Sequence, residues 1–146
     1  MIRVLGPEVI GHLIDFATLC IDDAEVQALI PRVSDRKIIT YGVSPQADVR
    51  VTNIETTPDG SSFDIVIMDR KSGAERSIEE LHLPMVGVHN ILNSTAAIGI
   101  ALELGISDDL IRTGLANFGG VKRRFTKTGA VDGITIIDDY GHHPVE

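Results

Sequence analysis

The sequence predicts a mixed α/β fold, and three observations support this prediction. Two short β-rich runs flank a helical segment within residues 17–42, which is typical of parallel strands joined by a helix in a βαβ element. Alternating apolar and polar residues separated by turns follow over residues 48–83, and this spacing indicates a small antiparallel sheet. Two helical segments then occupy residues 90–118, before the chain returns to β character.

The composition describes one globular domain and excludes several classes of protein. The chain has 146 residues, of which 43% are hydrophobic and 23% charged, and this length suits a single core. A formal charge of -8 argues against a general binder of nucleic acid or of an anionic membrane. The single cysteine, Cys20, forms no internal disulfide, and no apolar run approaches the roughly 20 residues that span a bilayer. Because Glu8 and Asp15 interrupt the N-terminal apolar stretch, we expect no signal peptide and a cytoplasmic location.

The parallel element begins with an apolar strand at residues 17–21 and ends with a second strand at residues 37–42. Between them we expect a helix capped by Asp22 or Asp23, and Asp22 has the capping-box spacing to Glu25. This helix ends near a proline and carries its apolar residues on one face: Val26, Leu29 and Ile30.

The antiparallel segment is marked by its turns. The first expected strand, residues 48–55, alternates regularly except at Ile54, which is out of phase. A turn at residues 58–60 and another at residues 71–73 separate it from two further strands. The last of these strands covers residues 76–83.

The helices and the last strands are bounded by capping and turn residues. A helix over residues 90–103 ends at Gly105, and Ser107 caps the next helix, whose inward side chains are Leu110, Ile111 and Leu115. Two strands at residues 124–128 and 134–137 then flank a turn. A further helix is expected at the start of the chain, over residues 7–16.

The first candidate site is the pair of asparagines at the start of the long helix. Asn90 and Asn93 are three residues apart and therefore project on the same side. A carboxamide both donates and accepts hydrogen bonds, as reading the edge of an adenine requires. The alternative is structural: Asn90 caps the helix, and Asn93 is a solvated first-turn residue.

Two further segments carry polar residues that suit ligand binding. In residues 119–125 a glycine pair precedes three cations, which suits an anion but also a solvated basic edge. In residues 138–143, Asp139 and His142 follow an apolar strand, and such strand ends bind ligands in open α/β sheets. A metal site there is disfavoured, since adjacent residues of an extended chain point to opposite faces. His82 and Cys20 lie in apolar surroundings and are expected in the core.

No phosphate-binding loop of the Walker type and no Gly-x-Gly-x-x-Gly element occurs in the chain. A nucleotide would therefore be bound here without the usual cradle for its triphosphate.

Taken together, these segments resemble the Mur ligases, the ATP-dependent amide-forming enzymes of peptidoglycan synthesis. The similarity runs from Thr18 to the last residue, and its most specific parts are GVHNILNSTAA, GGVKRRFT and IDDYGHHPVE. The first motif is common to the family, and the other two are typical of its alanine-adding branch. A branch that recycles murein tripeptide is similar but carries Phe-Ala in place of Tyr140-Gly141, and it is the second interpretation.

The resemblance implies a division of the chain and roles for individual residues. Residues 1–121 would be the second half of a central ATPase domain, and residues 122–146 the first strands of a C-terminal domain that binds the amino acid. Asn90 and Asn93 would contact the adenine, and Asp139 would hold the ribose or help to fix the hinge. The resemblance also implies two catalytic residues: Arg124, which would reach the triphosphate, and His142, which would lie near the γ-phosphate.

The activity implied for the whole enzyme is ATP-dependent joining of L-alanine to UDP-N-acetylmuramate through an acyl phosphate. The cofactors would be ATP and Mg²⁺, with no metal ligand in this chain and the magnesium ligands outside it. Since the phosphate loop is absent from these residues, we expect the isolated chain to be inactive as a ligase. The other alternative is a non-catalytic module that binds a nucleotide or a partner protein. Self-association is also expected, through an exposed sheet edge at residues 17–42.

Overall fold

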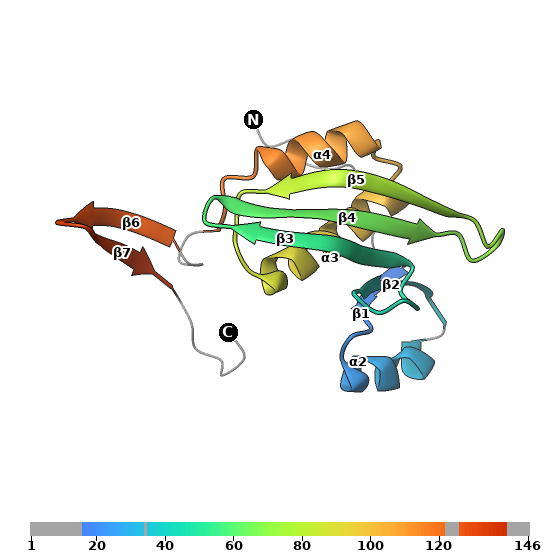
Figure 1. Ribbon diagram of the computed structural model, residues 1–146. Coiled ribbons are helices and arrows are strands. Elements are labelled where there is room, and N and C mark those ends of the chain that lie inside the picture. Colours follow the sequence, from blue (N-terminus) through green and yellow to red (C-terminus); the bar gives the residue numbers. More distant parts are fainter. Residues whose placement is uncertain (1–15, 34, 122–125, 140–146) are drawn as a thin grey trace, which may run out of the picture.

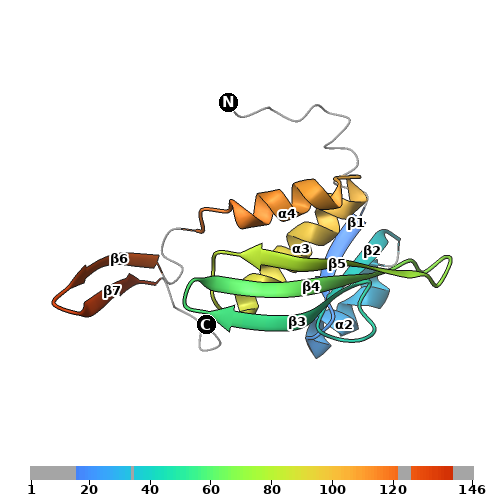
Figure 2. The same ribbon diagram turned by 45° about the horizontal axis from the view of Figure 1, so that its top comes forward.

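The computed structural model describes residues 16–33, 35–121 and 126–139 (Figures 1 and 2). Its strands and helices follow the order expected from the sequence. They are β1 Phe16–Cys20, α2 Ala24–Leu29, the 3₁₀ helix η1 Ile30–Val33, β2 Lys37–Gly42, β3 Val49–Thr57, β4 Gly60–Met68, β5 Glu75–Leu83, α3 Val88–Glu103, α4 Asp108–Ala116, β6 Thr126–Val131 and β7 Ile134–Asp138. The helix expected over residues 7–16 lies almost entirely outside the described residues, and Phe16 begins β1 instead.

Strands β1 to β5 form one sheet in sequence order (Figure 1). The pairs β1–β2 and β2–β3 are parallel, whereas β3–β4 and β4–β5 are antiparallel. The predicted parallel element and antiparallel meander are both confirmed, and the structure joins them into a single mixed sheet. The junction is short, because β2 and β3 pair only at Tyr41 with Val49 and at Gly42 with Arg50.

The two long helices lie on one face of this sheet (Figure 2). Helix α3 packs across β1 to β4, and α4 packs against β5. The face of α3 toward the sheet is buried, with Ile91 and Thr95 fully inaccessible and Ile98 2% exposed. Strand residues that alternate along β3 and β4, such as Val51, Phe63 and Ile65, form the other side of the core.

Helix α2 is capped by Asp23, one of the two caps expected from the sequence, and the capping-box spacing from Asp22 to Glu25 is not used. The Asp23 carboxylate accepts hydrogen bonds from the backbone N–H groups of Glu25 and Val26. The Asp22 carboxylate instead accepts hydrogen bonds from the backbone N–H groups of Val43 and Ser44, each at 2.9 Å. These bonds hold the loop that follows β2. The predicted apolar face of α2 is not buried in this structure.

Two β-bulges explain why the alternation of the meander is irregular. The register of β3 shifts between Thr52 and Glu55, where Asn53 has a φ of 51°, and Ile54 thereby returns to the core side. The second bulge lies in β5 at Glu80, which has a φ of 56°. Asp64 links the two bulges, because its carboxylate accepts hydrogen bonds from the Asn53 amide and from the Glu80 backbone.

The helix ends follow the sequence closely, with one error in the inward face of α4. Gly105 has a φ of 71°, and the N–H of Ile106 donates to the Ala101 carbonyl in the Schellman pattern. Ser107 is the N-cap of α4, although its side chain makes no capping hydrogen bond. Ile111 is buried as predicted, whereas Leu110 is 65% exposed. The prediction for Leu110 is wrong because the surface of α4 that packs on β5 is narrower than the apolar face of the helix.

Strands β6 and β7 form a separate two-stranded antiparallel sheet beside the main one (Figure 1). Asp132 and Gly133 connect them with φ values of 50° and 80°, which is typical of a type I′ hairpin turn. The predicted boundary between residues 121 and 122 borders the undescribed residues 122–125, so it stays a prediction. Among the described residues, no helix is long and apolar enough to cross a membrane.

Candidate functional site

A cavity of about 220 Å³ lies between the N-terminal half of α3 and the C-terminal end of α4. It brings together both asparagines that the sequence singled out, and the remaining lining residues are mostly small or apolar. The lining residues are Met85, Asn90, Asn93, Ser94, Ala97, Gly114, Leu115, Phe118 and Val121. The predicted geometry, two carboxamides on one side of a helix, is therefore present at a cavity wall.

Asn90 is not the cap of α3, so the structural alternative for this residue is wrong. Gly87 is the N-cap, with a φ of 101°, and Asn90 lies three residues further on, in the first turn. The Asn90 side chain is 7% exposed, and its amide nitrogen donates to the Val86 carbonyl at 2.8 Å. A carbonyl only accepts, so the contacting atom is Nδ2, and this fixes Oδ1 as the acceptor available to a ligand.

Asn93 is exposed and contributes to the same cavity one turn along α3. Opposite it, Leu115 and Phe118 supply apolar surface from α4 and the residues that follow it. Such a cavity, apolar on its walls with a few polar groups on one side, suits a flat heterocyclic base. The arrangement allows the base edge to form hydrogen bonds while its faces pack against apolar atoms.

The other predicted site residues are only partly within the described chain. Arg124 and His142 lie outside it. Asp139 is exposed and directly follows β7. In the described residues β7 pairs with β6 in an antiparallel hairpin, and the role of Asp139 in ligand binding stays a prediction.

The structure corrects the two residues that were expected in the core. His82 is exposed, because it lies on the opposite side of β5 from its buried neighbours Leu81 and Leu83. Cys20 is half-buried at the end of β1, and burial raises the pKa of its thiol. Burial likewise raises the pKa of the neighbouring Tyr41 hydroxyl, so both groups are neutral near pH 7.

The apolar wall of the cavity was not predicted from the sequence. The sequence predicts Leu115 on the inward face of a helical segment that extends to residue 118, without a link to the asparagines. Their contribution depends on how α4 folds back beside α3, which no local pattern encodes. In residues 16–33, 35–121 and 126–139 no three His, Cys, Asp or Glu side chains are grouped closely enough to hold a metal ion.

Comparison with known proteins identifies the family of this chain. The family described as the Mur ligase middle domain matches residues 11–101. UDP-N-acetylmuramate–L-alanine ligase from Rhodospirillum rubrum is 60% identical over 131 residues, which are 90% of this chain and 27% of that protein. The chain therefore spans about a quarter of the length of this relative.

Solved structures give the same result. MurF from Acinetobacter baumannii matches with a TM-score of 0.71 and 28% identity, over 89% of this chain and 27% of that one. UDP-N-acetylmuramate–alanine ligase MurC from Thermotoga maritima matches with a TM-score of 0.57 and 25% identity, over 73% of this chain and 24% of that one. Since the family match covers well over half of the 146 residues, this chain belongs to the Mur ligase family.

Proposed function

We propose that this chain forms the adenine-binding half of the ATP site in a UDP-N-acetylmuramate–L-alanine ligase. The observation that carries the proposal is the cavity between α3 and α4, in which Asn90 and Asn93 lie together against an apolar wall. The relative from Rhodospirillum rubrum, 60% identical over 131 residues, supports the choice of ligase.

The residues of the cavity suit an adenine ring. The Oδ1 atom of Asn90 is oriented by the bond from Nδ2 to the Val86 carbonyl, and it would accept a hydrogen bond from the exocyclic amine. Asn93 would supply the complementary donor to a ring nitrogen. Leu115 and Phe118 would cover the faces of the ring and exclude water from these hydrogen bonds.

The remaining roles belong to the proposal for the whole enzyme. Arg124 would contact the triphosphate, Asp139 the ribose or the hinge, and His142 the region of the γ-phosphate. ATP would activate the carboxylate of UDP-N-acetylmuramate for reaction with L-alanine, and its magnesium ligands would come from outside this chain. The residues described here would bind and orient the base. We also propose that the enzyme acts in the cytoplasm.

The second candidate is the tripeptide-recycling branch of the family. Tyr140 and Gly141, where that branch carries Phe-Ala, favour the alanine-adding ligase. Substrate choice by the full-length protein distinguishes the two branches.

An amide NMR titration of this chain with ATP tests the proposal. We expect saturable shifts at Asn90, Asn93, Ala97 and Gly114, and the same pattern with adenosine, because the base makes the contacts. Asn93→Ala should weaken binding about three- to tenfold, as expected for one hydrogen bond. Gln46→Ala removes an equally exposed carboxamide away from the cavity and should leave the affinity unchanged.

The proposal is contradicted if millimolar ATP shifts no residue of the cavity, or if guanosine binds as well as adenosine. The isolated chain should not hydrolyse ATP when UDP-N-acetylmuramate, L-alanine and Mg²⁺ are added. Turnover above background would overturn the expectation that this chain lacks part of the catalytic site.

A further inference from the structure

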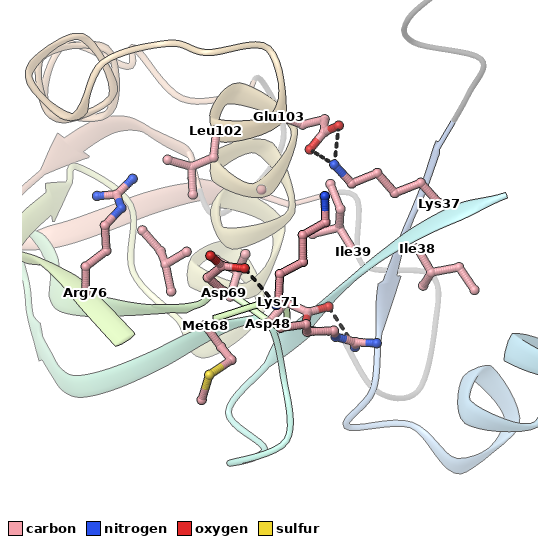
Figure 3. A pocket seen from close by; sticks show the side chains of 14 residues that line it. Lys37, Ile38, Ile39, Asp48, Met68, Asp69, Lys71, Arg76, Leu102 and Glu103 are labelled. Atoms are coloured by element: carbon pink, nitrogen blue, oxygen red, sulfur yellow. Dashed lines mark hydrogen bonds and ion pairs between the residues drawn. The ribbon is translucent and has the colours of Figure 1, made fainter. Parts of the chain in front are cut away.

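A second and larger cavity, of about 370 Å³, lies at the opposite end of α3 from the asparagines (Figure 3). Asn90 and Glu103 are separated by about 20 Å along the helix axis, at 1.5 Å per residue. The volume lies within the range of small-molecule sites. Its lining residues are Lys37, Ile38, Ile39, Asp48, Val49, Ile67, Met68, Asp69, Arg70, Lys71, Arg76, Gly99, Leu102 and Glu103. We call this cavity the β2 notch.

The notch exists because β2 and β3 diverge. The two strands pair only from Tyr41 onwards, so residues 37–40 of β2 have no strand beside them on that side. Asp48 occupies part of the gap, since its carboxylate accepts a hydrogen bond from the Thr40 backbone N–H at 2.8 Å. Backbone groups alternate in direction along a strand, so those of Ile38 point the same way as those of Thr40. The backbone N–H and C=O groups of Ile38 therefore face the notch, as one donor and one acceptor on an unpaired part of the strand edge.

Among the described residues around the notch, one cation forms no ion pair. The Lys37 Nζ atom lies 2.6 Å from the Glu103 carboxylate, and the Arg70 guanidinium forms a bidentate ion pair with the Asp48 carboxylate. Arg76 binds Asp108 at 2.7 Å.

The Asp69 carboxylate accepts hydrogen bonds from the Lys71 backbone at 2.8 Å and from the Ser72 hydroxyl at 2.7 Å. The Lys71 ammonium has no ion-pair partner in the described part of the chain, although the protein as a whole has a charge of -8. In Figure 3 the Lys71 side chain runs from the turn beside Asp69 in the direction of Lys37 and Glu103, on the other side of the notch.

The floor of the notch is apolar. Ile39 and Val49 from the sheet and Leu102 from α3 are among its apolar lining residues. The notch thus combines a strand edge, an apolar surface and a positive charge. These three features suit an amide, an apolar group and an anionic group of one ligand.

We propose that the β2 notch binds an N-acyl amino acid unit with an apolar side chain and a free carboxylate, as at the C-terminus of a short peptide. The amide of the ligand pairs with the backbone of Ile38 in the manner of an added strand. Its side chain packs on the floor formed by Ile39, Val49 and Leu102, and its carboxylate binds the Lys71 ammonium.

An NMR titration of the 146-residue chain with N-acetyl-L-leucine tests this site. We expect saturable shifts at Ile38, Lys71 and Leu102, with the Ile38 amide proton moving downfield as it donates a hydrogen bond. N-acetyl-L-leucinamide, which lacks the carboxylate, should bind at least about threefold more weakly, as for the loss of one exposed ion pair.

Charge reversal separates a specific contact from a general effect of net charge. Lys71→Glu should weaken binding of N-acetyl-L-leucine by about tenfold, since it removes one attraction and adds one repulsion. Arg32→Glu changes the net charge equally on η1, outside the notch, and should leave the affinity unchanged.

Three outcomes would overturn the proposal: equal affinity for the acid and the amide, equal weakening by both charge reversals, or no saturable shift at Ile38 at millimolar ligand. The ATP titration reports on the other end of α3, so failure of one site is independent of failure of the other.

Discussion

At the scale of single residues, a group of connected hydrogen bonds centres on Asp48. Its side chain is 13% exposed and accepts hydrogen bonds from the Thr40 backbone and hydroxyl, each at 2.8 Å, and from the Arg70 guanidinium. These bonds replace the strand pairing that β2 lacks beside β3. Asp48 therefore ties the parallel part of the sheet to the turn after β4.

We predict that Asp48→Ala destabilises the fold by about 2 kcal/mol. The substitution leaves the Thr40 N–H without its acceptor and removes the charged partner of Arg70, and such losses cost about 1–3 kcal/mol. Urea denaturation followed by circular dichroism measures the change. Asp59→Ala, an exposed carboxylate in the β3–β4 turn, is the matched control and should stay within about 0.5 kcal/mol.

A second prediction concerns the turn after β4 and its dependence on pH. The hydrogen bond from the Ser72 hydroxyl, followed by that from the Lys71 backbone, lowers the pKa of Asp69 from its ordinary value of 3.8. A lowered pKa in the folded state means that the ionised carboxylate stabilises the fold above pH 3.8. This contribution is lost as the pH falls through the folded-state pKa.

Asp69→Asn should therefore be less stable than the natural sequence at pH 7, and the difference should shrink as the pH falls below 3.8. Thermal unfolding measured between neutral and acidic pH tests this expectation. A difference that grows on acidification would contradict it.

At the scale of the elements, two glycines show opposite requirements. Gly99 lies in the middle of α3, and a Cβ added there would meet Ile39 at 3.5 Å and Val49 at 3.7 Å, which are ordinary contacts. Gly60 begins β4 with a φ of 148°, and a Cβ there would lie 2.5 Å from the Leu83 carbonyl oxygen. Of these two positions, only that of Gly60 has a backbone conformation and surroundings that exclude a side chain.

We predict that Gly99→Ala stabilises the protein by about 0.5–1 kcal/mol, because alanine loses less backbone entropy than glycine in a helix. Gly60→Ala should destabilise it by more than about 1 kcal/mol, since both the positive φ and the clash oppose a side chain. Midpoints of urea denaturation give both values. Equal effects of the two substitutions would show that backbone conformation does not distinguish these positions.

At the scale of the whole molecule, strand β1 is one of the two edges of the five-stranded sheet. Within the part of the chain that the structure describes it pairs only with β2, and all five of its residues are half-buried. It carries no charge or proline, the usual protection of an edge. The Thr18 hydroxyl is buried without a hydrogen-bond partner in the described structure. We therefore expect two copies of the chain to associate through β1.

A pair of proline substitutions tests this association. The N–H of Ile21 donates to Tyr41, so by alternation the N–H of Ala17 points toward β2 and that of Thr18 points outward. Thr18→Pro should abolish the dimer and keep the fold, whereas Ala17→Pro should disrupt the sheet. Sedimentation velocity at high protein concentration gives the oligomeric state, and circular dichroism gives the fold. A natural sequence that is monomeric at every concentration would contradict the expectation.

Much of this architecture could be predicted from the sequence. The ends of α3 and α4, the turn at residues 58–60 and the last hairpin depend on glycine, serine and aspartate chemistry within a few residues. The motif around Asn90 and Asn93 placed both side chains on one side of a helix, because the helical period alone decides this. The predictions for Arg124 and His142 remain untested.

The sequence by itself determined which residues form strands and helices, which family the chain resembles and which side of α3 carries the asparagines. Only the tertiary structure decided what those elements enclose. The apolar wall opposite Asn93, the exposure of Leu110 and His82, and the β2 notch all depend on how elements distant in sequence pack and where their registers begin. Local patterns set backbone conformation through nearby residues, whereas a cavity is the space left between surfaces that no single segment contains.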